Sequence, residues 1–459
     1  METAGTRAGA STPRLSNWRL AVFSLPAMIA ALILGPFAGV LPTIYAERFS
    51  LDLVAIGSVL LAARILDAVV DPAIGLFSDK TRSPLGSRKP WIGAGIIVAT
   101  VAMLFLFLPQ GEVDATYLLL WLLIFYFGYS LLEIPYGAWA LELSRESRER
   151  ARINAFRAAA LYAGGILFTL APALVPAAQG RMDFAALAVI GLVLAVIGPL
   201  SVAAAIGFVP RGDVLVSEPP KLTELWASVR GSKPFQAFVA MYAFIGIASG
   251  VSGIVSFMYI SSYLQIGDRF TELFLPATIL GPIMIPVWTW LLRRFDKYKV
   301  TAIAFTLYAC IMPLAWFVAP GPDAFLPMLL IFCGLSLFYP LLMISMPTML
   351  GDIIDQDELE TGKNRAAQFS AFLVLVAKGT AAVGGPLALL VIGAFGFDPA
   401  SAENSEQAIL GLRLANNWLP VLLVAPGVLL LWLFPMTDAR HAAIKAQLDE
   451  RRLAAQPAP

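Results

Sequence analysis

Long apolar runs separated by short polar connections make up most of the chain. Each run is close to 20 residues or longer, which is the length that an α-helix needs to cross a lipid bilayer. Read in order, the runs predict twelve membrane-spanning helices. They cover residues 20–46, 53–77, 91–109, 115–142, 152–177, 184–209, 235–264, 270–292, 300–319, 324–350, 367–396 and 415–435.

The polar connections differ in charge between the two predicted sides of the membrane. Most of the 32 Lys and Arg residues lie in the two tails and in the loops after every second span. Because basic residues concentrate on the cytoplasmic side, both termini are predicted to be cytoplasmic in a multi-pass protein of the cell (inner) membrane. The first apolar run is too long for the core of a signal peptide, so we interpret it as an uncleaved helix.

The longest connection predicted to be cytoplasmic, residues 211–234, divides the spans into two sets of six. Leu222, Leu225, Trp226 and Val229 follow helical spacing in it and predict a short interfacial helix. We therefore expect an N-terminal half over 1–210, this linker, a C-terminal half over 235–435 and a cytoplasmic tail over 436–459. The plan predicts an all-α membrane protein with the major facilitator fold and a mid-membrane substrate site.

The composition agrees with the membrane class and limits the chemistry. Of 459 residues, 59% are hydrophobic and 14% charged, and the net charge of +1 provides no basic surface for nucleic acid. A single histidine and two cysteines exclude histidine-ligated metals, zinc clusters and a disulfide framework. The chain carries no phosphate-binding loop and no nucleophile–base set, so we expect neither an enzyme nor a cofactor. A non-transport membrane protein is the distant alternative.

The second predicted span contains three charged residues on one face. Arg64, Asp67 and Asp71 follow i, i+3, i+7 spacing. A charge at bilayer depth costs at least about 2.5–3.5 kcal/mol, and two neighbouring carboxylates in a low dielectric cannot both stay ionised. Pro72 also leaves the carbonyl of Ala68 without its helical partner. These features predict a site for a proton or a small cation; the alternative is a static salt bridge with Arg64.

Three further charges lie in other spans, namely Glu133, Arg157 and Lys378. With Arg64, Asp67 and Asp71 they make three acids and three bases, so we expect the empty site to be roughly balanced in charge, and we expect these three residues to bind substrate. For Arg157 the alternative is that its side chain extends to the cytoplasmic interface, and for Glu133 and Lys378 it is an ion pair that bridges the two halves.

A second group of charges is predicted at the cytoplasmic mouth. Asp79, Arg82 and Arg88 follow the second span, and Asp352 and Asp355 follow the tenth. We interpret them as a gate whose ion pairs hold an outward-open state and break on switching. The alternative is that the basic residues only set the orientation of the protein in the membrane, which would explain the arginines but not the aspartates.

Three blocks of the sequence resemble the glycoside–pentoside–hexuronide:cation symporters, whose type member is the melibiose carrier. The first block runs from Arg64 to Pro90, and the second from Ile134-Pro135-Tyr136 to Phe156-Arg157. The third is Asp352-Ile353-Ile354-Asp355 with Thr361-Gly362, followed by Lys378. The resemblance covers nearly the whole chain.

The resemblance implies roles for individual residues. The cation site would consist of Asp67, Asp71, Ser130 and Glu133, with Arg64 in its charge network. The substrate site would contain Glu133, Arg157, Lys378 and the nearby Trp139, although Gly137 stands where the family has a tryptophan. The coupling ion would be H⁺ or Na⁺, and no metal is expected beyond a sodium ion at Asp67 and Asp71.

The sequence also departs from the family. Val70 replaces an amide that precedes the second aspartate in sodium-coupled members, which removes an oxygen ligand and favours a proton. No acidic residue lies between Asn17 and Glu47, so the acid that grips sugar hydroxyls in the first span is absent. We therefore expect a proton-coupled symporter of a small organic solute, a sugar or glycoside, acting as a monomer in the lipid bilayer. The alternative is a carrier of lysophospholipid or another amphiphile.

Overall fold

The computed structural model describes residues 14–144, 146–212, 226, 229–363, 365–401 and 403–454. These residues form helices and no strand, and twelve helical segments are long and apolar enough to cross a membrane. The all-α membrane fold predicted from the apolar runs is confirmed. Most of the proposed interfacial helix around Leu222 lies outside the described residues.

The first half of the chain forms one bundle. It contains α1 (Asn17–Gly35), the π-helical segment η1 (Pro36–Val40), α2 (Leu41–Phe49), α3 (Leu53–Lys80), α4 (Lys89–Phe107), α5 (Ala115–Glu142), α6 (Ser147–Leu174), η2 (Pro176–Ala178) and α7 (Phe184–Phe208). Aspartates begin several of these helices, because their carboxylates accept backbone N–H bonds that a helix start leaves unpaired. Asp52 accepts from Ala55 at the start of α3, and Asp114 from Tyr117 at the start of α5.

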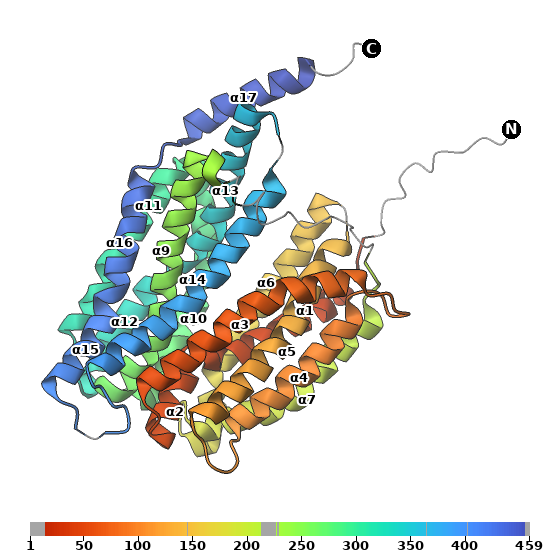
Figure 1. Ribbon diagram of the computed structural model, residues 1–459. Helices are drawn as coiled ribbons and strands as arrows, with labels where there is room; N and C mark the ends of the chain where they lie inside the picture. The colour runs from red at the N-terminus through yellow and green to blue at the C-terminus, as the bar shows by residue number, and fades with distance from the viewer. Residues whose placement is uncertain are drawn as a thin grey trace.

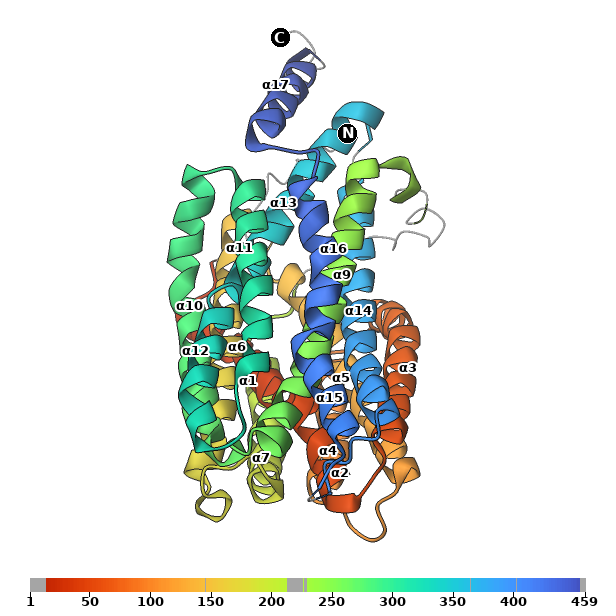
Figure 2. The ribbon, with the colours of Figure 1, turned by 90° about the vertical axis from the view of Figure 1, so that its left-hand side faces the viewer.

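The second half forms another bundle and a tail helix. Its elements are α9 (Lys233–Met258), η3 (Tyr259–Tyr263), η4 (Gly267–Arg269), α10 (Phe270–Arg294), α11 (Lys297–Ile311), η5 (Met312–Phe317), η6 (Pro322–Ala324), α12 (Phe325–Ser336), α13 (Tyr339–Thr361), α14 (Ala366–Ala394), α15 (Glu406–Asn417), α16 (Leu419–Trp432) and α17 (Asp438–Ala454). Figure 2 shows α17 beyond the end of the bundle.

Several predicted spans are interrupted or displaced. The first is interrupted by η1, since neither Pro36 at the start of η1 nor Pro42 at the start of α2 can donate a backbone hydrogen bond. The tenth ends at Thr361 and not at 350, so the acidic residues expected in a loop continue its last helix. The twelfth begins with α15, which places Arg413 in a helix and not in a loop.

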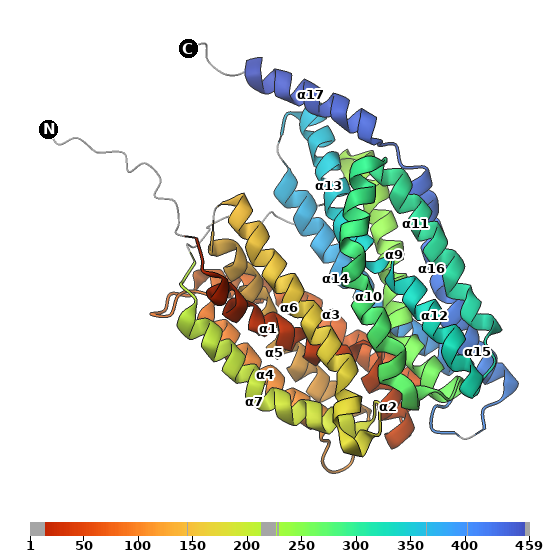
Figure 3. The same cartoon turned by 180° about the vertical axis from the view of Figure 1, so that it is seen from behind.

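The two bundles meet at one end and diverge at the other (Figures 1 and 3). We call the end with α17 and the start of α1 the terminal side, and the opposite end, with α2 and α15, the far side. Across the halves, α3 packs against α14, α6 against α10, and η1 against α9. The backbones approach closely at η1, where a Cβ added to Gly39 would lie 2.2 Å from the carbonyl oxygen of Gly253.

Candidate charged site between the two halves

Helix α3 places the two aspartates of the second span in the interior of the protein. Asp67 and Asp71 are one turn apart, and their side chains are 15% and 11% exposed. Asp71 lies about 14 Å from the terminal-side end of α3, calculated from the helix rise. Both carboxylates are thus shielded but remain within reach of solvent.

Asp67 has a polar partner on a neighbouring helix of the same half. The Ser130 hydroxyl, from α5, donates to its Oδ1 at 2.6 Å. The Arg64 Nη1 atom is 3.8 Å from Oδ2, and the Arg64 guanidinium lies over the Tyr126 ring at 4.2 Å from its centroid. Because the contact is long and the guanidinium also lies over an aromatic ring, Arg64 partly offsets the charge of Asp67 but does not form a close ion pair with it.

Asp71 has two different oxygens. Its Oδ2 forms an ion pair with Lys378 of α14, which joins the two halves. Its Oδ1 is buried and has no hydrogen-bond partner. Buried polar atoms nearly always have a partner, so an unpartnered carboxylate oxygen is a vacant acceptor for a proton or a cation.

Glu133 and Arg157 lie around this pair. Glu133 is exposed in the middle of α5 and interacts electrostatically with Lys378, Asp71 and Asp67. Arg157 lies about 15 Å into α6, over the Tyr136 ring at 4.7 Å, and its buried Nε has no hydrogen-bond partner. The helix α6 begins at Ser147, earlier than the predicted span.

Two expectations about this site need correction. Lys378 forms its ion pair with Asp71, not with Glu133 as the bridging alternative had it. Trp139, expected at the substrate, is buried, packs edge-on against Phe23 and donates its indole N–H to the carbonyl of Pro210 at 3.1 Å. It therefore belongs to the packing of the N-terminal half.

The N-terminal part of the predicted gate forms a network of its own. Arg88 pairs with Asp79 and with Glu142, with 2.7 Å between Arg88 Nη2 and Glu142 Oε1. Burial lowers the pKa of the Arg88 guanidinium, but these two carboxylates raise it by more, so the net shift is upward. Arg82 is exposed.

The C-terminal part of the gate is likewise satisfied within its own half. Asp352 pairs with Lys297 and accepts a hydrogen bond from the Tyr298 hydroxyl at 2.7 Å. The His441 Nε2 atom of α17 lies 2.9 Å from an Asp355 oxygen. The gate residues of the two halves thus pair separately in this conformer, in which the halves diverge on that side.

The aromatic partners of the charged residues were not predicted from the sequence. Tyr126 under Arg64 and Tyr136 under Arg157 each provide a ring face, which attracts a guanidinium without neutralising it. The spacing could have indicated Tyr126, because this residue lies one turn before Ser130 on α5 and therefore on the same helix face.

The fold and the charged interface between two six-helix bundles define a secondary transporter of the major facilitator type. The chain belongs to the MFS/sugar transport protein family, which matches residues 22–438. This match confirms the resemblance to the glycoside–pentoside–hexuronide:cation symporters and the multi-pass membrane character.

Individual relatives extend over most of the chain. The "Putative glycoside/cation symporter YagG" of Escherichia coli (strain K12) is 26% identical over 434 residues, which cover 89% of this chain and 90% of that protein. The "Sodium-dependent lysophosphatidylcholine symporter 1" of Xenopus tropicalis is 22% identical over 85% of this chain and 82% of its own length. The crystal structure of the nucleoside transporter NupG superposes with a TM-score of 0.66 at 14% identity, covering 91% of this chain and 98% of that one, which shows the shared fold.

Proposed function

We propose that the protein couples the inward movement of a proton, in preference to a sodium ion, to the uptake of a small organic solute, a sugar or glycoside. The observation that carries this proposal is the unequal environment of the two Asp71 oxygens, one paired with Lys378 across the halves and one buried without a partner. A proton on the free oxygen neutralises the carboxylate and weakens its hold on Lys378.

This arrangement supplies a reason for coupling. When Asp71 is protonated, Lys378 loses its partner, and an unpaired ammonium at this depth is unfavourable. A solute that offers an acceptor to Lys378 removes that penalty, so proton and solute stabilise the same loaded state. In the empty carrier the Asp71–Lys378 pair forms again, and the two halves can change back to the opposite-facing conformation without solute.

The local ligands favour a proton as the coupling ion. Hard metal cations are held by several oxygen atoms. Asp67 Oδ1 already accepts a hydrogen bond from Ser130, and Val70 offers no oxygen beside Asp71. A proton needs only one acceptor. We further propose that Glu133 and Arg157 bind the solute, and that the terminal side is cytoplasmic in an inner-membrane protein.

The relatives support two classes of solute. The E. coli glycoside/cation relative supports a sugar or glycoside, which we take as the leading candidate. The Xenopus relative supports a lysophospholipid, and the largely apolar cavity of the C-terminal half also favours a solute with an apolar part.

The test is uptake by the purified protein in liposomes, with a proton or sodium gradient imposed, across glycosides and lysophospholipids. We expect proton-driven accumulation that Asp71→Asn abolishes, because the substituted side chain cannot carry the proton. Asp52→Ser on the same helix is the control, since it removes a carboxylate but leaves a side chain that can cap α3. Full accumulation by a folded Asp71→Asn protein would remove Asp71 from the mechanism.

A further inference from the structure

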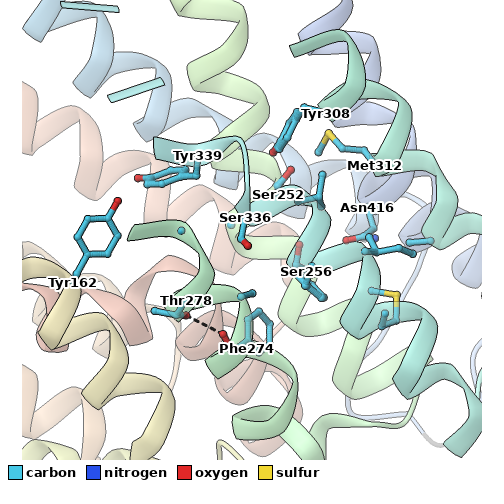
Figure 4. Close-up of a pocket in the computed structure, with 18 residues that line it drawn as sticks. Tyr162, Ser252, Ser256, Phe274, Thr278, Tyr308, Met312, Ser336, Tyr339 and Asn416 are labelled. Atoms are coloured by element: carbon cyan, nitrogen blue, oxygen red, sulfur yellow. Dashed lines mark hydrogen bonds between the residues drawn. The ribbon is translucent and has the colours of Figure 1, made fainter. Parts of the chain in front are cut away.

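A cavity lies in the C-terminal half, and the paired aspartates do not line it. Its volume is about 440 Å³, within the range of about 300–1,000 Å³ typical of small-molecule pockets. Its walls come from α9, α10, α11, η5, α12, α13 and α15, with one residue, Tyr162, from α6 of the other half (Figure 4).

The chemistry of the walls selects an uncharged group. Among the described residues that line the cavity none carries a formal charge, and most of the surface is apolar, with Phe274, Phe332, Met312 and Met328 among the apolar side chains. Such walls bind aromatic or aliphatic groups through burial and ring contacts. An ion or an unsubstituted sugar, which needs several directed hydrogen bonds, does not match them.

One polar atom in the walls requires a partner. The Ser252 hydroxyl is buried and makes no hydrogen bond. Two other hydroxyls of the cavity are satisfied by their own helices: Thr278 donates to the carbonyl of Phe274 at 2.9 Å, drawn as the dashed line in Figure 4, and Ser336 to that of Cys333 at 2.8 Å. The free Ser252 hydroxyl therefore matches a ligand with a polar substituent on an apolar body.

The cavity adjoins the interface that holds the charged site. Tyr162 and Tyr339 come from opposite halves and lie on the same side of the cavity in Figure 4, and Tyr339 is 58% exposed. Tyr162 is five residues beyond Arg157 on α6, which is about 8 Å along the helix toward the far side. A solute bound by its polar end near Arg157 and Lys378 can thus extend its other end toward the cavity.

We propose that this cavity is a subsite for an uncharged, ring-sized apolar part of the solute, such as the aromatic aglycone of a glycoside. The inference rests on the proposed function and narrows it to amphipathic glycosides. The charged interface binds the glycone, the C-terminal cavity binds the aglycone, and Ser252 bonds to a polar substituent on the ring.

The test uses the full-length protein in lipid nanodiscs and measures binding without any gradient. The probes are methyl, phenyl and 4-hydroxyphenyl β-D-glycosides of glucose, galactose and glucuronic acid. Leu335→Trp fills the cavity, while Leu330→Trp on the same helix, at a 64% exposed position outside the cavity, is the matched control. Ser252→Ala removes only the free hydroxyl and serves as a second, milder variant.

For one of these glycones we expect the phenyl glycoside to bind roughly tenfold more tightly than the methyl glycoside. Leu335→Trp should abolish this preference without weakening the methyl glycoside, and Leu330→Trp should retain it. Ser252→Ala should remove only the additional gain of the 4-hydroxyphenyl compound. Equal binding of methyl and phenyl glycosides, or a preference that survives in Leu335→Trp, would overturn the proposal.

Two outcomes separate this inference from the proposed function. Ring-selective binding without gradient-driven uptake would support the subsite and contradict cation-coupled transport. If lysophosphatidylcholine binds, is weakened by Leu335→Trp and no aryl glycoside binds, the cavity is an acyl-chain site and the aglycone assignment is wrong.

Discussion

At the scale of single residues, the surroundings of one carboxylate differ between its two oxygens. Asp71 holds Lys378 with one oxygen and leaves the other buried without a partner. Asp67, one turn earlier, accepts from Ser130 and only weakly engages Arg64. The two aspartates thus differ in their chemical surroundings, because Asp71 alone of the two has a buried oxygen without a hydrogen-bond partner.

Val70 provides a test of why a proton is favoured over sodium. Val70→Asn adds an amide oxygen beside the paired aspartates, because position 70 follows Asp67 by three residues on the same helix face. In Val70→Asn we expect sodium to stimulate uptake at an about tenfold lower concentration than in wild type. This change is equivalent to ~1.4 kcal/mol of sodium-binding free energy. The measurement is uptake at constant pH over a series of sodium concentrations.

The matched control is the same substitution one residue earlier. Val69 is 68% exposed and points away from the pair, so Val69→Asn should leave the sodium dependence unchanged. An identical ion profile for wild type and Val70→Asn would contradict the assignment of position 70 to the cation site.

At the scale of elements, the far-side closure depends on glycine. A Cβ on Gly39 in η1 would overlap the Gly253 carbonyl of α9, and one on Gly393 in α14 would lie 2.6 Å from the Val54 side chain of α3. Helix pairs from opposite halves can therefore touch only because these positions lack a side chain. Their separation on the far side is the movement that alternating access requires.

Gly39→Ala should open the far side. The added methyl group cannot fit at 2.2 Å from a carbonyl oxygen, and overpacking of this kind costs about 1–3 kcal/mol. We expect the far-side-closed conformer to lose roughly 5–150-fold in relative population. Distances between spin labels at positions 112 and 323, both exposed on the far side, report the change.

Gly207→Ala is the control for this substitution, because an added Cβ there has no neighbour within 4 Å. It should leave the distances unchanged. If Gly39→Ala leaves them unchanged as well, the glycine contact does not limit closure.

At the scale of the whole molecule, polar contacts are arranged differently on the two sides. On the terminal side each half satisfies its own charges, with Arg88 in one network and Asp352 in another. On the far side a hydrogen bond crosses the halves, from the Ser262 hydroxyl to Glu47 Oε1 at 3.2 Å. In this conformer a polar contact therefore joins the two halves on the far side. On the terminal side the gate residues Arg88 and Asp352 form their ion pairs within their own halves.

We expect Glu47 to make far-side closure dependent on pH. Burial raises the pKa of the Glu47 carboxyl above its ordinary value of 4.5, and the nearby Arg181 and the Ser262 hydrogen bond oppose this rise. The closed conformer consequently binds the Glu47 proton more tightly than a conformer in which Glu47 is solvated. Closure is favoured below the ordinary pKa and is progressively lost as the pH rises through the raised value.

We expect the same spin-label distances to lengthen as the pH rises from 4.5, and Glu47→Gln, an uncharged analogue of the protonated acid, to remain closed. Other carboxylates titrate in the same pH interval. We therefore assign to Glu47 only the difference between the distance–pH profiles of wild type and Glu47→Gln. Parallel pH profiles for the two proteins would exclude Glu47 as the cause.

The sequence by itself determined the number of spans, the division into two bundles and the face of α3 that carries the acids. These follow from local rules, because bilayer thickness sets the length of an apolar run and helical periodicity sets which side chains share a face. The tertiary structure alone decided that Lys378 pairs with Asp71, that Trp139 is buried, that the gate residues pair within their own halves, and that residues of eight elements line an apolar cavity. Each of these depends on how helices distant in the chain pack together, which no spacing along one helix records.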